Sequence, residues 1–108
     1  MSTLVELSDD EFQTTIDGAA VPVLVDFSAT WCQPCKALAP VIEAVAGEFE
    51  GKLIVRKVDI DKAQQTAIRF GIQGVPTCIF FKGGTEVDRF HGMKDLNEVR
   101  GFVEKVIG

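Results

Sequence analysis

Residues 25–36 read Val-Asp-Phe-Ser-Ala-Thr-Trp-Cys-Gln-Pro-Cys-Lys, an apolar run followed by two cysteines that are separated by two residues. Two thiols at this spacing can close to a disulfide and open again, which is reversible two-electron chemistry. The apolar residues from Val21 to Phe27 predict a central strand, and the apolar spacing after Pro34 predicts a helix. Cys32 would then lie at the positive end of that helix, where the field favours the thiolate and makes it a nucleophile.

The composition is typical of a single soluble domain. The chain has 108 residues, 46% of them hydrophobic and 25% charged, so we expect one domain over residues 1–108. The formal net charge of −5 argues against a nucleic-acid partner, because no basic stripe is present to bind phosphates. We expect neither a signal peptide nor a membrane span. Three cysteines, two of them in one motif, suit a reducing compartment, and we therefore expect a cytoplasmic protein.

The rest of the chain predicts an α/β fold. Further strands are expected over residues 53–58, 77–81 and 86–90, the last two joined by a hairpin at Gly83-Gly84, and a short first strand near Thr3–Glu6. Helices are expected after Ser8 and after Asp95, and a short helix that Asp61 caps is expected to end near Phe70-Gly71. Helical crossovers imply parallel strands and the hairpin implies antiparallel ones. We therefore predict a mixed, five-stranded central sheet flanked by four helices, with the cysteines at the carboxyl end of a strand.

Residues 25–36 resemble the active-site segment of thioredoxins. The segments Lys57-Val58-Asp59, Gly74-Val75-Pro76-Thr77, Gly83-Gly84 and the single Gly92 also match this family, in its order and with its spacings, across essentially the whole chain. The resemblance implies a thioredoxin fold and a thiol–disulfide oxidoreductase that acts as a general protein disulfide reductase. Two positions depart from the family pattern. Most thioredoxins have glycine where this chain has Gln33, which leaves the redox potential open, and many bacterial members have tryptophan where Ser28 stands.

The resemblance also implies roles for individual residues. Cys32 would attack a substrate disulfide, and Cys35 would resolve the mixed disulfide. Asp26 lies in an apolar run, where a charge is costly unless it is paired, and it is expected to accept the proton of Cys35 with a pKa raised by burial. Lys57, on a strand expected beside Asp26, would shift that pKa in the opposite direction. The sequence does not decide which effect is larger.

An apolar surface around the cysteines is expected to bind substrate proteins. It comprises Trp31, Gln33, Pro34, Gly74, Val75, Pro76 and Gly92. In thioredoxins the Val-Pro bond that matches Val75-Pro76 is cis, and the Val75 backbone is then available to pair with an extended substrate. Strand alternation places Cys78 inside, either as an inert buried thiol or as a third sulfur that modulates the pair.

The resemblance further implies how the protein is supplied with electrons. We expect no bound cofactor and no metal, with electrons drawn from NADPH or ferredoxin through a separate thioredoxin reductase. The other expected partners are diverse disulfide-containing proteins, and the protein is expected to be a monomer.

Three alternatives remain open from the sequence. Because Gln33 replaces the usual glycine, the protein could be a more oxidising, thioredoxin-like isomerase or oxidase. It could be a redox-silent docking module that uses the same apolar surface. It could also bind a metal through Cys32, Cys35, Cys78 and His91.

Overall fold

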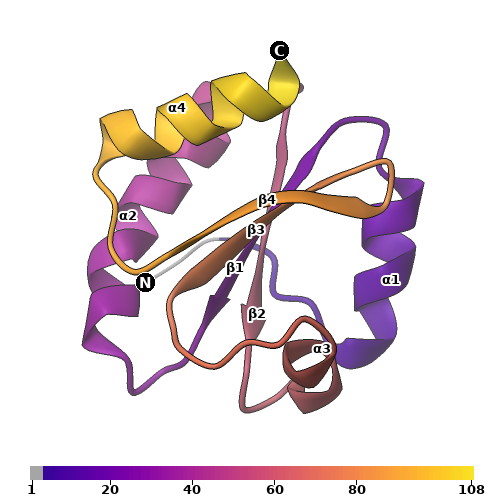
Figure 1. Cartoon of the computed structure of the whole chain (residues 1–108), viewed down its shortest axis with the longest axis vertical. Helices are drawn as coiled ribbons and strands as arrows, with labels where there is room; N and C mark the ends of the chain where they lie inside the picture. The colour runs from indigo at the N-terminus through magenta and orange to yellow at the C-terminus, as the bar shows by residue number, and fades with distance from the viewer. Residues whose placement is uncertain (1–3) are drawn as a thin grey trace.

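The computed structural model describes residues 4–108. In this range it has four helices and a four-stranded sheet, with helices on both faces of the sheet (Figure 1). In chain order these are α1 (Asp9–Gly18), β1 (Val23–Ser28), α2 (Gln33–Glu48), β2 (Ile54–Asp59), α3 (Gln64–Arg69), β3 (Thr77–Lys82), β4 (Thr85–His91) and α4 (Leu96–Ile107). The strand order in the sheet is β2-β1-β3-β4. β1 and β2 are parallel, whereas β3 is antiparallel to both of its neighbours. This is the mixed α/β sheet that the sequence predicts.

The prediction of a fifth strand near Thr3–Glu6 was wrong in extent. Thr3 lies outside the described residues, and Glu6 makes only an isolated parallel bridge with Lys57. Two backbone hydrogen bonds hold this bridge, from the Leu7 N–H to the Lys57 carbonyl (2.9 Å) and from the Lys57 N–H to the Val5 carbonyl (3.0 Å). Because α1 begins almost directly after the bridge, the chain leaves the edge of β2 before a ladder can form.

Two hydrophobic clusters hold the sheet, one on each face. The first lies under α2 and α4, and the second lies under α1 and α3, as the placement of the helices in Figure 1 shows. Four phenylalanines, Phe12, Phe27, Phe80 and Phe81, are at most 1% exposed. β1 contributes to both clusters, with Leu24 on one face and Phe27 on the other. The strand that leads to the cysteines is therefore fixed from both sides.

The β3–β4 hairpin closes through the expected glycine pair. Gly83 and Gly84 have φ angles of +62° and +80°, the backbone that a two-residue hairpin turn with two left-handed positions requires. The turn brings β4 back along β3 and places Gly92 beside the loop that precedes β3, where its N–H donates to the Pro76 carbonyl.

The described part of the chain is close-packed. Its radius of gyration is 12.4 Å, near the value of about 13 Å for a compact chain of this length. The longest helix between residues 4 and 108 is α2, with 16 residues, and no helix in this range is both long and apolar enough to cross a membrane.

Candidate functional site

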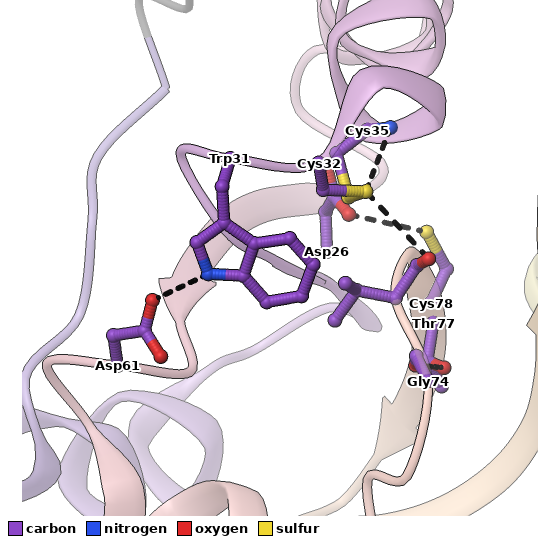
Figure 2. Close-up of a disulfide and its surroundings, with 9 residues drawn as sticks. Asp26, Trp31, Cys32, Cys35, Asp61, Gly74, Thr77 and Cys78 are labelled. Atoms are coloured by element: carbon purple, nitrogen blue, oxygen red, sulfur yellow. Dashed lines mark hydrogen bonds between the residues drawn. A yellow bond between two sulfur atoms is a disulfide. The ribbon is translucent and has the colours of Figure 1, made fainter.

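The two cysteines lie at the carboxyl end of β1, where α2 begins. They form a disulfide with a Cα–Cα distance of 5.3 Å, and each cysteine is only 5% exposed. Cys32 is the N-cap residue of α2, and its sulfur accepts a hydrogen bond of 3.2 Å from the Cys35 N–H (Figure 2). Pro34 lies in the first turn, where its missing N–H removes no intrahelical bond. The helix field and this N–H donor both favour a thiolate on Cys32 when the disulfide is open.

Asp26 lies behind the disulfide, buried in the sheet. In the strand register it is directly opposite Lys57 on β2 and Cys78 on β3. Burial raises the pKa of Asp26 to about 6, while a hydrogen bond from the Cys78 thiol and the positive charge of Lys57 act in the opposite direction. Desolvation is the largest of the three effects. The sequence left open whether burial or Lys57 has the larger effect on the pKa of Asp26, and in the structure the effect of burial is larger.

A cavity of about 390 Å³ joins Asp26 to the second cysteine and to solvent. Its lining consists of Asp26, Ser28, Ala29, Thr30, Cys35, Lys36, Ala39, Pro40 and Lys57. Ser28 lies on the cavity wall, at the position where many bacterial thioredoxins carry the much larger tryptophan. Asp26 and Cys35 thus line the same solvent-connected cavity, in which a water molecule could carry a proton between them.

The loop before β3 presents one backbone position towards the cysteines. The Val75-Pro76 bond is cis, as the resemblance implied. The Thr77 hydroxyl donates to the Gly74 carbonyl (2.7 Å), and the Gly92 N–H donates to the Pro76 carbonyl (2.8 Å). The N–H of Val75 has no hydrogen-bond partner among residues 4–108. The carbonyls of Gly74 and Pro76 are therefore occupied within the protein, whereas the Val75 N–H between them is not.

Val75 also borders the disulfide. Its carbonyl oxygen is 3.6 Å from the Cys32 sulfur, and Val75 packs on the small apolar cluster that contains Ala29 and both cysteines. Pro76 is buried, whereas Gly74 is exposed. Gln33 and Pro34, which follow Cys32 in the first turn of α2, are exposed. The structure thus places Val75 against the disulfide and links Gly74 and Gly92 to the same loop by hydrogen bonds, while Pro76 is buried. The role of these positions as a substrate surface stays a prediction.

Trp31 has a partner that the sequence analysis missed. Trp31 is 64% exposed, and its indole N–H donates a hydrogen bond of 2.8 Å to the carboxylate of Asp61 (Figure 2). Asp61 was expected to cap a helix, but α3 begins only at Gln64, with Ala63 as its N-cap residue. Since β1 and β2 are parallel, the residues just beyond their carboxyl ends meet at one edge of the sheet, and this topology was the available signal.

Cys78 and His91, which the metal-binding alternative needs beside the two other cysteines, instead contact different partners. The Cys78 sulfur contacts Asp26 in the sheet, whereas His91 is exposed and its Nδ1 lies 3.0 Å from the Thr77 hydroxyl. In the described range, 4–108, no three His, Cys, Asp or Glu side chains are grouped so that they could hold a metal ion.

Comparisons with known proteins agree with this geometry. The thioredoxin family model matches residues 3–105. The chain is 44% identical over 105 residues to Thioredoxin 1 of Nostoc sp., covering 97% of this chain and 98% of the relative. It is 38% identical over 106 residues to Thioredoxin C-2 of Corynebacterium nephridii, covering 98% of both. It is also 40% identical over 108 residues to the mitochondrial thioredoxin of Bos taurus, covering 99% of this chain but only 65% of that protein.

Proposed function

This chain belongs to the thioredoxin family, and we propose how its own residues carry out the thiol–disulfide exchange of that family. It is a thiol–disulfide oxidoreductase with protein-disulfide reductase activity, and neither the oxidase nor the docking alternative is favoured. The observation that carries the proposal is the sulfur of Cys32 at the N-cap of α2, bonded to the Cys35 N–H and bordered by Val75. The Cys32 sulfur thus has a hydrogen-bond donor of its own and lies beside the loop that precedes β3.

The first step is attack by the reduced form of the protein on a substrate disulfide. The Cys32 thiolate forms a bond to one substrate sulfur, and the substrate disulfide bond breaks. The second substrate sulfur leaves as a thiolate and takes up a proton. The substrate chain lies along Val75 as an added strand, held by its backbone, while Trp31 and the exposed Gln33 and Pro34 border it.

The second step releases the substrate. The Cys35 thiol gives its proton to Asp26, and the Cys35 sulfur attacks the Cys32 sulfur. The mixed disulfide breaks, the remaining substrate sulfur leaves as a thiolate and is protonated, and the Cys32–Cys35 disulfide seen in the structure forms. The pair loses two electrons and the substrate gains two. Burial raises the pKa of Asp26 to about 6, and Lys57, which lies opposite it, partly offsets this rise, so most of the carboxylate is ionised and able to accept the proton at neutral pH.

A separate protein must return the disulfide to the dithiol. We assign this role to a thioredoxin reductase that draws electrons from NADPH or ferredoxin, since thioredoxins typically work without a bound cofactor of their own. The substrates we propose are diverse disulfide-containing proteins, and the protein acts as a monomer. A cytoplasmic location is supported by the cysteine usage, because a dithiol that cycles as a reductant needs a reducing compartment.

Trapping of the mixed disulfide tests this proposal. In Cys35→Ser the first step proceeds but the second cannot, so the variant should accumulate covalent adducts with a protein disulfide substrate that dithiothreitol releases. Cys32→Ser is the matched control and should form none. A Cys35→Ser variant that retains full reductase activity, or that forms no adduct, would contradict the assigned roles.

A further inference from the structure

Cys78 is a buried thiol that the two steps above do not use. It is 0% exposed and has no disulfide partner among the described residues. Its sulfur lies 3.8 Å from Oδ1 of Asp26, within hydrogen-bond distance for a sulfur donor (Figure 2). We propose that Cys78 is a positioning residue for Asp26, its thiol donating a hydrogen bond that favours the ionised carboxylate beside Cys35. The inference rests on the proposed function, because it concerns the residue assigned as proton acceptor.

The sheet register fixes this contact. Asp26 is paired with Lys57 on one side and with Cys78 on the other, so the three side chains form one row across β2, β1 and β3. Paired residues on neighbouring strands point to the same face of a sheet, here the face that α2 covers. Asp26 is therefore held between a cation and a neutral thiol. A one-residue change of register would move Cys78 to the opposite face.

The charged and titratable groups that face Asp26 come from the neighbouring strands β2 and β3 and from helix α2. Lys57 faces it from β2, Cys78 from β3, and Cys35 and Lys36 from α2 across the shared cavity. Cys35 cannot titrate while it is in the disulfide. In the oxidised protein, a titration of Asp26 therefore reports on its fixed surroundings alone.

The thiol is a donor throughout this titration. Burial, together with the neighbouring carboxylate, raises the pKa of Cys78 well above its usual range, so the thiol keeps its proton when Asp26 ionises. A fixed donor stabilises the charged form of an acceptor relative to its neutral form. Loss of the donor would leave Asp26 more dependent on Lys57, and a smaller fraction of it would be ionised at neutral pH.

Two variants of similar shape distinguish the effect of the hydrogen-bond donor at position 78 from the effect of side-chain volume. Threonine and valine have nearly the same shape, but only threonine can donate to Asp26. We would measure the ionisation of Asp26 in the oxidised protein by the NMR signal of its labelled carboxyl carbon. The midpoint should rise by about half a pH unit or more in Cys78→Val, because one unit corresponds to about 1.4 kcal/mol and a thiol is a weak donor. In Cys78→Thr it should stay at or below that of the natural protein.

Controls make each outcome decisive. Ile79→Val removes a methylene from the other face of β3 and should leave the Asp26 midpoint unchanged. If the valine variant matches the natural protein, or if the valine and threonine variants share one midpoint, the inference is overturned. Should either variant fail to fold, Cys78→Ala and Cys78→Ser repeat the comparison without added volume.

A second readout distinguishes failure of this inference from failure of the proposed function. The pH profile of disulfide reduction by Cys78→Val should move upward by the same shift as the Asp26 midpoint. If the midpoint moves but the profile does not, the hydrogen bond stands and the assignment of Asp26 as proton acceptor fails. If neither moves while Asp26→Asn still slows the reaction, the role of Asp26 stands and that of Cys78 fails.

Discussion

At the scale of single residues, Asp26 shows how burial changes the behaviour of one side chain. Its pKa is raised from 3.8 to about 6, chiefly by desolvation. The folded protein therefore binds this proton more tightly than the unfolded chain does. The contribution of Asp26 to stability is greatest below about pH 4, falls as the pH rises to about 6, and is constant above that. The full effect at neutral pH corresponds to roughly 3 kcal/mol.

Replacement of Asp26 by asparagine should increase the stability of the protein and decrease its activity. In Asp26→Asn the charge is absent at every pH, so the free energy of unfolding at pH 7.5 should rise by up to about 3 kcal/mol. Release of the mixed disulfide should slow, since the proton acceptor is lost. Urea unfolding at several pH values between 4 and 7.5 measures the first effect, with the exposed Asp10→Asn as control. The expectation fails if the Asp26→Asn variant keeps the loss of stability between pH 4 and 6 that the natural protein shows.

The hydrogen bond between Trp31 and Asp61 yields a prediction about substrate binding. Asp61→Ala removes the acceptor that holds the exposed indole beside Cys32, and the ring must then be ordered by the substrate. KM for a protein disulfide should rise several-fold while kcat changes little, because the sulfurs are untouched. Asp61→Asn keeps a side-chain oxygen and serves as the matched control. A fall in kcat with unchanged KM would show that the indole acts on the chemical step instead.

At the scale of elements, the sequence predicts what local patterns encode. The buried β1, the helix start at Pro34 and the two-glycine hairpin all have signals within a few residues, and the structure has each of them. The length of the fifth strand was overestimated. Helix α1 begins at Asp9, so the extended segment before it forms only one bridge with β2. Strand-forming residues alone do not show how far a ladder extends.

Contacts between distant segments could not be predicted in this way. The partners in the Trp31–Asp61 and Cys78–Asp26 hydrogen bonds are 30 and 52 residues apart. α3 has no side-chain cap of its own, and Asp9 of α1 instead accepts hydrogen bonds from the backbone N–H and hydroxyl of Thr66 (2.8 and 2.6 Å). Each of these pairs depends on the register or packing of whole elements. The family resemblance supplied the cysteines and Pro76, but it did not supply these pairs.

The hairpin offers a test at this scale. Gly83 and Gly84 both have positive φ, and an alanine at either position should cost about 1 kcal/mol in backbone strain. A methyl group at Gly84 would also lie 2.5 Å from Oδ1 of Asp17, which could move away only by giving up the hydrogen bond that it accepts from Gln13. None of the described atoms is within 4 Å of the same position at Gly83. Gly84→Ala should therefore destabilise the protein more than Gly83→Ala does in urea unfolding. Adding Asp17→Ala should remove only the excess, and equal effects of the two single variants would contradict this account.

At the scale of the whole molecule, the redox pair is largely separate from the core. Cys32 and Cys35 belong to a small cluster with Ala29, apart from the two large clusters that hold the sheet. Reduction should therefore leave the fold and its buried surface unchanged. It does remove a cross-link that closes a four-residue loop, and the chain-entropy model gives such a loop roughly 2 kcal/mol.

The oxidised protein should accordingly unfold at higher urea concentration than the reduced protein, by about 2 kcal/mol and with the same dependence on denaturant. Since we propose a single domain over residues 1–108, each form should show one transition that coincides by Trp31 fluorescence and by circular dichroism. Cys35→Ser is the control, because reductant cannot change its cross-linking. Equal stability of the two redox forms would mean that native contacts of the free thiols offset the loss of the cross-link. Two separate transitions would show that the chain does not fold as one cooperative unit.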